Sequence, residues 1–279
     1  MKVQSSKHAP AGFKQGFKVQ SPKNLFYIIA VIYCLLPVFS FAETREFTLT
    51  VTDGEIELND TKFTVWKYND MFPGPEIRVK EGDIVTVKVL NKSSVNHGFF
   101  FHGLHVGARV AEQEQKIVIE PGYEYTYGPF AAKPSGTHLY HCSFNMAEHL
   151  SRGMYGAFIV EAKDEPKFDK ELVYIISDWN SKDAKGGVSH GTGHPMSIMD
   201  NDVFTINDKV ITKDTPIVID AKKGEKIRVR LANIGHLPHK LTSNKDFTIT
   251  HEDGYPSPEP KRQNSITIYP GKRHDIVIT

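Results

Sequence analysis

The chain has 279 residues, enough for two domains of ordinary size, and its 39% of hydrophobic residues is sufficient for packed cores. Charged residues make up 24% of the chain, and the formal net charge is +1. We expect no nucleic-acid partner, because proteins that neutralise phosphates usually carry a clear basic excess.

The N-terminus has the pattern of a signal peptide, predicted at residues 1–42. Lys14, Lys18 and Lys23 precede an apolar run that ends in SFA at 40–42, with small residues at the two positions that a signal peptidase reads. The run is about 17 residues long, shorter than the roughly 20 of a membrane span, and an uncleaved N-terminal anchor is the alternative. In either case we expect the rest of the chain outside the cytoplasm, in a periplasm or another exported location.

Export makes the cysteine count informative. The sequence has two cysteines, Cys34 inside the predicted signal peptide and Cys142. A mature exported chain with one cysteine cannot form an internal disulfide. We therefore expect Cys142 to be either buried and inert or bound to a metal.

From residue 43 onwards the sequence predicts an all-β protein. Short alternating runs are separated by turn residues, at Glu46–Thr52, Glu76–Val79, Ile84–Leu90, Lys116–Ile119 and Ala157–Val160. No segment keeps a helical period of apolar residues for three turns. Regularly spaced short strands favour a β-sandwich or barrel over an α/β fold.

An internal repeat divides the chain into two copies of one sandwich. The segment IRVKEGDIVTVKVLN at 77–91 recurs as VIDAKKGEKIRVRLAN at 218–233, with an offset of 142 residues. The segment IEPG at 119–122 recurs as IYPG at 268–271, with an offset of 149 residues.

The repeat predicts two tandem Greek-key β-sandwiches, at residues 43–163 and 164–279. In the first copy, 39 residues separate Pro121 from Val160, the end of the last strand, whereas nine residues follow Pro270 in the second copy. We therefore expect the second sandwich to be incomplete at its C-terminus, as a fragment or as a curtailed domain.

Histidines are concentrated around Cys142. Six of them fall within 53 residues, at His97, His102, His105, His138, His141 and His149. A blue-copper site takes one thiolate, two imidazoles and a weak axial thioether, and Cys142-x6-His149-x4-Met154 offers three of these on one loop, with His97 as the fourth. A buried free thiol among surface histidines and a zinc site are the alternatives. The single thiolate, the methionine and the all-β repeat favour copper.

The motifs around these residues resemble the multicopper oxidase and copper-containing nitrite reductase superfamily, which has the cupredoxin fold. The matching segments are NHGFFFHG at 96–103, YHC at 140–142, HLSRGMYG at 149–156, FPGPEI at 72–77 and HEDGYP at 251–256. The resemblance covers nearly all of residues 45–279. Its motifs are specific in the first predicted domain and generic in the second.

Carried over residue by residue, the resemblance implies two copper centres. The type 1 copper, which accepts electrons, would be held by His97, Cys142, His149 and Met154, and a type 2 copper by His102 and His141. Neighbouring side chains on a strand point to opposite faces. Cys142 would therefore hold one metal and His141 the other, with a short covalent connection between them.

Two positions depart from the oxidase pattern. Multicopper oxidases have a His-x-His pair in both motifs, for a trinuclear cluster that reduces oxygen, and this chain has Phe100 and Ser143 instead of one histidine of each pair. The remaining pattern is similar to that of the nitrite reductases. They carry a proton-relaying aspartate at the position of Phe100, and a phenyl ring cannot transfer a proton. Their third type 2 histidine comes from a neighbouring subunit, so a homotrimer is a candidate assembly.

The second copy of the repeat is not expected to hold copper of its own. His239 lies 142 residues after His97, but Asn244 stands at the position of His102 and no cysteine follows. His236 and His239 are candidates for outer-shell groups near a neighbour's metal, with ordinary surface histidines as the alternative.

Two functions fit these features. The first is an exported copper oxidoreductase, which takes electrons from a donor protein or small reductant at the type 1 copper and reduces a small-molecule oxidant at the second copper. The second is a non-catalytic blue-copper electron carrier or copper-handling protein with a degenerate second site. Phe100 and Ser143 favour the second function, whereas His102 and His141 favour the first.

Overall fold

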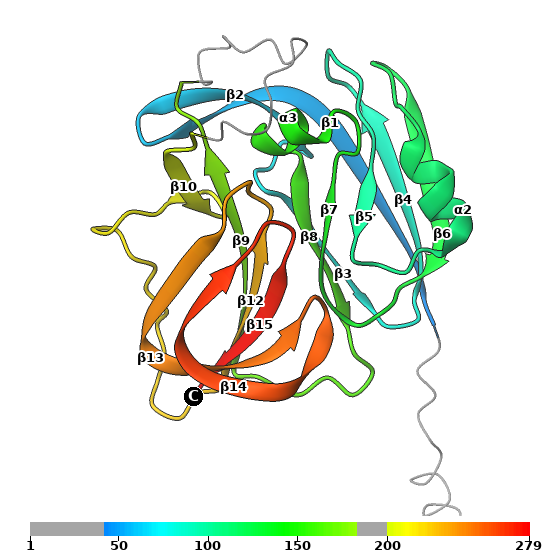
Figure 1. Cartoon of the computed structure of the whole chain (residues 1–279). Coiled ribbons are helices and arrows are strands. Elements are labelled where there is room, and N and C mark those ends of the chain that lie inside the picture. Colours follow the sequence, from blue (N-terminus) through cyan, green and yellow to red (C-terminus); the bar gives the residue numbers. More distant parts are fainter. Residues whose placement is uncertain (1–41, 183–199) are drawn as a thin grey trace, which may run out of the picture. The chain divides into compact units, whose positions relative to one another are not determined.

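The computed structural model describes residues 42–182 and 200–279, so the predicted signal peptide, apart from Ala42, lies outside the described residues. In the described part of the chain the long elements are all strands, which confirms the all-β prediction (Figure 1). Residues up to 161 form two four-stranded sheets, and residues from 170 onwards form one seven-stranded sheet.

The first half is a sandwich of two sheets. One sheet has the order β2-β1-β4-β6, formed by Thr61–Tyr68, Thr44–Leu58, Ile84–Asn91 and Glu124–Ala131. The other has the order β3-β8-β7-β5, formed by Gly74–Lys80, Tyr155–Glu161, Gly136–His141 and Phe100–His102. Val85, Val87 and Val89 alternate inwards along β4 into the core between the sheets, as the period of two requires. Each such side chain contributes about 1.5–3 kcal/mol by leaving water.

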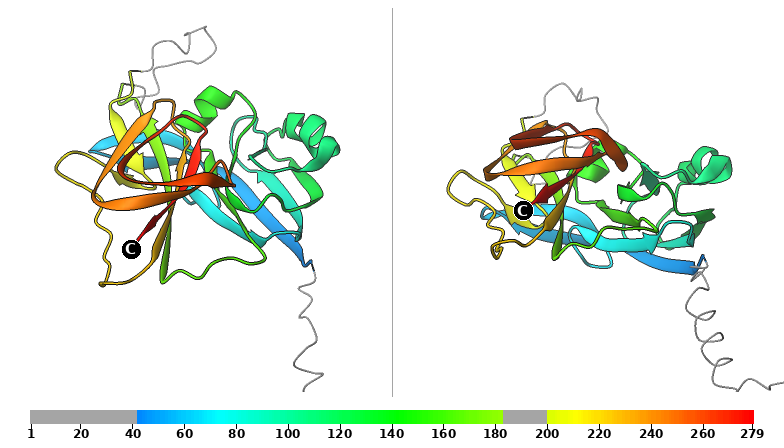
Figure 2. Two further views of the ribbon diagram at one scale, coloured as in Figure 1. Left: turned by 60° about the horizontal axis from the view of Figure 1, so that its bottom comes forward. Right: turned by 90° about the horizontal axis from the view of Figure 1, so that it is seen from below.

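The second half is a single sheet with the order β11-β10-β9-β12-β15-β13-β14. Its strands are β9 (Lys170–Trp179), β10 (Val203–Ile206), β11 (Lys209–Val210), β12 (Ile227–Asn233), β13 (His239–Glu252), β14 (Tyr255–Ile268) and β15 (Arg273–Ile278). Figure 2 shows this sheet, drawn in yellow-green to red, beside the sheets of the first half, drawn in blue to green.

The repeat corresponds to a shared pattern of strand pairing. In the first half β4 pairs parallel with β1 and antiparallel with β6, and in the second half β12 pairs parallel with β9 and antiparallel with β15. Each of the two central strands, β4 and β12, ends in a buried asparagine. The Asn91 side-chain amide donates to the carbonyls of Val95 and Ile119, at 2.7 and 2.8 Å. Asn233, 142 residues later, donates in the same way to Leu237 and Ile268, at 2.8 and 2.9 Å.

One predicted strand is wrong. Residues 116–119 do not form a strand, because Lys116 ends the 3-10 helix η1 (Glu114–Lys116), and Ile119 forms only an isolated bridge to His97. The residue types at 116–119 favour a strand, but no strand of the described residues pairs with this segment. Two short helices, α2 (Gly107–Glu112) and α3 (Met146–Ser151), also interrupt the loops. Among the described residues, no helix is long and apolar enough to cross a membrane.

The two halves share an apolar cluster. Leu139, Tyr155 and Ile159 from the first half pack in one buried group with Ile175 and Trp179 from the second. Because both halves lose water from the same surface, their association is stabilised by the hydrophobic effect.

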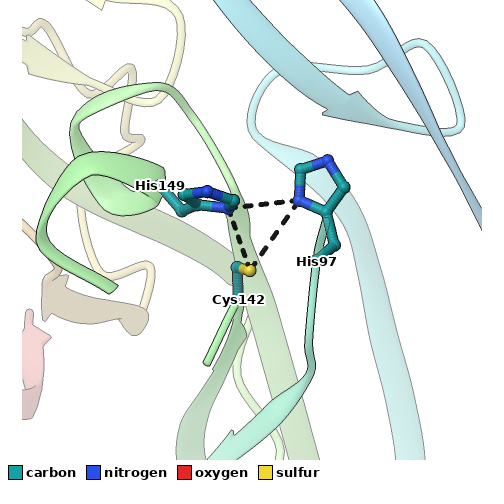
Figure 3. A group of neighbouring side chains, drawn as sticks. All are labelled: His97, Cys142 and His149. Atoms are coloured by element: carbon teal, nitrogen blue, oxygen red, sulfur yellow. Dashed lines mark hydrogen bonds between the residues drawn. The ribbon is translucent and has the colours of Figure 1, made fainter. Parts of the chain in front are cut away.

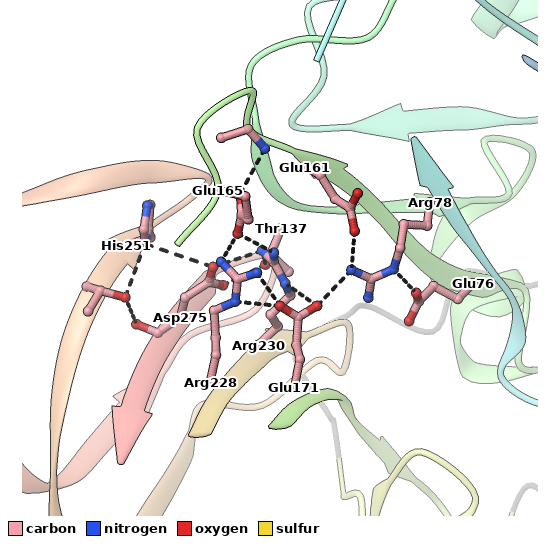
Figure 4. A network of polar contacts seen from close by, with 12 residues as sticks. Glu76, Arg78, Thr137, Glu161, Glu165, Glu171, Arg228, Arg230, His251 and Asp275 are labelled. Carbon is pink, nitrogen blue, oxygen red and sulfur yellow. Dashed lines mark hydrogen bonds and ion pairs between the residues drawn. The ribbon is translucent and has the colours of Figure 1, made fainter. Parts of the chain in front are cut away.

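A largely buried polar network also connects the two halves (Figure 4). The Arg230 guanidinium donates to Asp275 at 2.9 Å and to the Thr137 hydroxyl at 3.0 Å, and that hydroxyl donates to Asp275 at 2.6 Å. Glu171 accepts from Arg78 of the first half at 2.8 Å and pairs with Arg230 at 3.1 Å. Thr137 lies on β7, so the network connects the second half directly to that strand.

We expect Asp275→Asn to lower the free energy of unfolding by about 3 kcal/mol, because it removes one charge of a buried, hydrogen-bonded pair and leaves Arg230 short of a partner. The matched control is Asp246→Asn, which breaks the exposed Arg262–Asp246 pair and should cost less than about 1 kcal/mol. Urea unfolding measures both values. Equal, small losses would contradict a structural role for the network.

Candidate metal centre

The loop that follows β7 is closed by backbone hydrogen bonds. The Cys142 N–H donates to the Met154 carbonyl at 3.1 Å, and the Met154 N–H donates to the His149 carbonyl at 3.0 Å. Helix α3 lies inside this loop and carries His149. The loop therefore brings Cys142, His149 and Met154 together at the end of the buried strand β7.

Three metal-binding atoms meet at this point (Figure 3). Cys142 Sγ lies 3.1 Å from His149 Nδ1 and 3.8 Å from His97 Nδ1, and the two Nδ1 atoms are 3.1 Å apart. His97 enters from the other side through its bridge to Ile119. In the described part of the chain this is the one group of three or more Cys, His, Asp or Glu side chains close enough to share an ion.

Met154, the predicted axial ligand, is fully buried and belongs to the same hydrophobic cluster as Cys142. Its place is set by the backbone bonds at both ends of the loop. A thioether is the type of donor that serves as the long, weak axial ligand of blue-copper sites.

Neighbouring groups orient the donor atoms. The Ser93 hydroxyl donates to the Asn91 side chain at 2.8 Å, so it accepts from His97 Nε2, also at 2.8 Å. Nε2 then carries the proton, and the Nδ1 lone pair is free to bind a metal. The Gly98 N–H donates to Cys142 Sγ at 3.3 Å. Such a bond stabilises a thiolate.

The Trp66 ring packs against the imidazoles of His97 and His149. Its ring centroid lies 5.3 Å from that of His97 and 4.5 Å from that of His149. The indole N–H donates to Asp53 at 3.1 Å, and the Arg152 guanidinium lies over the ring. Trp66, like Ser93, was not predicted as part of the site. Its contribution is recognisable only when β2 is placed against the loop.

Burial determines the protonation of these groups. It raises the pKa of Cys142 to about 12 and lowers that of His97 to about 3, with a smaller effect of His149 on His97. Burial and Arg152 lower the pKa of His149 to about 4. Both imidazoles are therefore neutral at pH 7, the form that binds metals, and a metal would displace the thiol proton. One soft thiolate and two imidazoles fit copper.

The second predicted pair also meets. His102 Nδ1 lies 3.3 Å from His141 Nε2, and His141 Nδ1 lies 2.9 Å from the Cys142 carbonyl, to which it can donate. Burial, together with His141 and Arg273, lowers the pKa of His102 to about 4, and burial also lowers that of His141. The two facing nitrogens are thus lone-pair donors suited to a metal. No third metal-binding side chain joins this pair within 42–182 and 200–279.

Two groups close the surroundings of this pair. The Phe100 ring stacks on His141 with centroids 5.1 Å apart. A methyl group at Gly271 would come within 3.2 Å of the His102 ring, so the second half of the chain lies directly against it. The Phe100 ring therefore makes one side of the pair apolar, and the second half of the chain, including the charged Arg273, lies against His102.

His239 has a partner within its own half. Its Nε2 lies 2.9 Å from an oxygen of Asp178, which is almost fully buried. Burial raises the pKa of Asp178, but the hydrogen bonds from His239, the Leu237 N–H and Asn201 outweigh it, and the net shift is downwards. A role of His239 near a neighbour's metal remains a prediction.

A β-sandwich that holds a buried thiol and two imidazoles at one end is a cupredoxin architecture, and comparison with known families agrees. Two models described as multicopper oxidase match residues 50–165 and 170–279. The chain therefore belongs to the multicopper oxidase family, whose members are copper-dependent oxidoreductases that bind type 1 and further coppers.

Individual relatives include both oxidases and reductases. The chain is 28% identical over 245 residues to the multicopper oxidase mco of Staphylococcus epidermidis, covering 84% of this chain and 53% of that protein. It is 31% identical over 202 residues to the copper-containing nitrite reductase of Neisseria meningitidis, covering 69% and 48%. The chain thus spans about half the length of these relatives.

Among solved structures, the chain is similar to the blue copper oxidase from Nitrosomonas europaea. The TM-score is 0.73 at 34% identity, over 84% of this chain and 75% of that one. The cupredoxin fold predicted from the motifs is confirmed.

We expect Cys142→Ser to abolish the intense visible absorption of the copper-loaded protein, because that band arises from charge transfer between the thiolate and copper. Ser143→Ala, one residue further along the loop, should leave the colour unchanged. The absorption spectra of both variants, with copper content measured in parallel, test the assignment. Colour that survives Cys142→Ser would refute it.

Ser93→Ala should weaken copper binding about 10- to 100-fold, because His97 loses the acceptor that holds its Nε2 proton. Competition with a copper chelator measures the affinity. Ser181→Ala, which removes an exposed hydroxyl bonded to Asp202, is the control and should leave the affinity unchanged. An unchanged affinity in Ser93→Ala would show that packing alone orients His97.

Proposed function

We propose that the chain is an exported copper oxidoreductase, which accepts electrons at the Cys142 site and reduces a small molecule at the His102–His141 site. The observation that carries this proposal is the adjacency of Cys142 and His141. Cys142 lies with the core of the first half, whereas His141 faces His102. Two different donor sets are therefore separated by one peptide unit.

Copper would supply reversible one-electron chemistry at these donor sets. His97, Cys142, His149 and Met154 would hold the first ion, and His102 and His141 would contribute to the second. The Cys142 side chain and backbone connect covalently to His141, and the hydrogen bond from His141 Nδ1 to the Cys142 carbonyl adds a second, shorter connection. Cys142 and His141 are both buried, so the connection between them is shielded from water.

The second set needs further groups. Two histidines leave a copper ion open to a third ligand and a substrate, and a neighbouring copy in a homotrimer would supply the ligand. Phe100 excludes a proton relay at its own position, so protons would come from another group. The reductant would be a donor protein or a small molecule. The signal-like pattern of residues 1–42 supports export.

A non-catalytic blue-copper carrier or copper-handling protein is the second candidate. The observation in its favour is the environment of His141. The stacked Phe100 ring occupies the side where the related enzymes place a polar group, and the described residues offer two donors instead of three.

Metal analysis with electron paramagnetic resonance on the purified protein separates the two functions. The oxidoreductase predicts two coppers per chain, with type 1 and type 2 signals, and His141→Ala should remove the type 2 signal while the blue colour remains. His105→Ala is the control, because His105 contacts Tyr255 rather than either donor set. One copper per chain, unchanged by His141→Ala, would contradict the enzyme.

A further inference from the structure

We propose that His236, in the second half of the chain, positions the helix that carries His149 and so sets the geometry of the Cys142 site. His236 would be a positioning residue rather than a ligand. The expected spectroscopic changes rest on the proposed function, because they require bound copper. The effect of His236 on α3 does not require copper.

The contact that carries the inference lies at the end of α3. The Ser151 hydroxyl donates to the Ala147 carbonyl at 3.0 Å, which uses its only proton. His236 Nε2 lies 2.8 Å from the same oxygen and therefore acts as the donor. Ser151 is two residues from His149, so this bond holds the ligand's own helix from the opposite half of the chain.

His236 is itself firmly placed. Its backbone N–H and that of Leu237 donate to the two oxygens of Asp178, at 3.2 and 3.1 Å. Asp178 lies on β9 and is almost fully buried. A methyl group at Gly235 would overlap the Asp178 carboxylate, so only glycine permits this close approach. The imidazole thus extends from a rigid anchor.

Helix α3 has little stability of its own. It has six residues, and its N-cap, Asn145, has a left-handed backbone and makes no side-chain cap bond. An isolated helix of this length does not persist in water. Other contacts also hold it: the Arg152 carbonyl accepts from the Trp66 backbone N–H at 3.0 Å, Leu150 packs against the shared apolar cluster, and the Trp66 ring lies against His149.

A movement of α3 would reach two predicted ligands. The His149 carbonyl accepts from the Met154 N–H at 3.0 Å, so the imidazole and the axial thioether move together. Cys142, in contrast, directly follows the fully buried strand β7, and His97 is held by its bridge to Ile119. Loss of the His236 bond should therefore change the distances of His149 and Met154 to the metal more than those of Cys142 and His97.

The test compares His236→Leu, which cannot donate, with His236→Gln, whose amide can. In the metal-free protein, hydrogen exchange of the His149 and Met154 amides should accelerate about fivefold in His236→Leu, the effect of one lost hydrogen bond. His236→Gln should restore much of the protection. In the copper-loaded protein, His236→Leu should change the type 1 hyperfine splitting and reduction potential.

Tyr255→Phe is the matched control. It removes the 3.1 Å contact between Tyr255 and His105, which also links the two halves but does not touch the copper loop. Exchange and spectra should then match the wild type. Unchanged exchange in His236→Leu, or the same acceleration in Tyr255→Phe, would overturn the inference.

Two further outcomes are separable. If His236→Leu does not fold, Ser151→Ala removes the same bond, together with the bond from Ser151 to the Ala147 carbonyl, and should also accelerate exchange of the His149 and Met154 amides. If the wild-type protein binds no copper, the proposed function fails, while hydrogen exchange still decides whether His236 holds α3.

Discussion

The structure depends on the burial of β7 from both sides. All six of its residues are buried, and they divide by alternation between two environments. Tyr140 packs into the core of the first half, and Cys142, directly after the strand, continues on that face. Leu139 packs into the cluster shared by the halves, and Thr137 enters the Arg230–Asp275 network. The strand that leads to the thiol is therefore held by both halves at once.

This constraint explains the character of the donor set. Cys142 cannot move without disturbing two cores, so its sulfur has a fixed position, and the loop to Met154 closes back onto it. Burial keeps His97 and His149 neutral, which prepares them as ligands. A site held in this way needs little rearrangement between redox states, and its supporting contacts come from residues that bind nothing themselves.

The second half has a structural role, although its described residues hold no metal-binding group of their own. It places Gly271 against His102, completes the cluster around Leu139 and extends His236 to Ser151. The repeat retains one structural contact in both halves. The Asn233 side chain holds the loop that follows β12 in the same way that the Asn91 side chain holds the loop that leads to His97. The second half thus contributes contacts around the donor atoms of the first half.

The sequence by itself determined the all-β class, the repeat and the group of Cys142 with His97 and His149, because strand alternation and ligand spacing on one loop are local properties. It misjudged Lys116–Ile119, since alternation cannot show whether a neighbouring strand exists to pair with. Only the tertiary structure placed Ser93 and Trp66 beside the donor atoms and His236 against Ser151. A serine, an indole or an imidazole of this kind has no local signature, and its function arises from contacts such as that between Ser151 and His236, 85 residues apart.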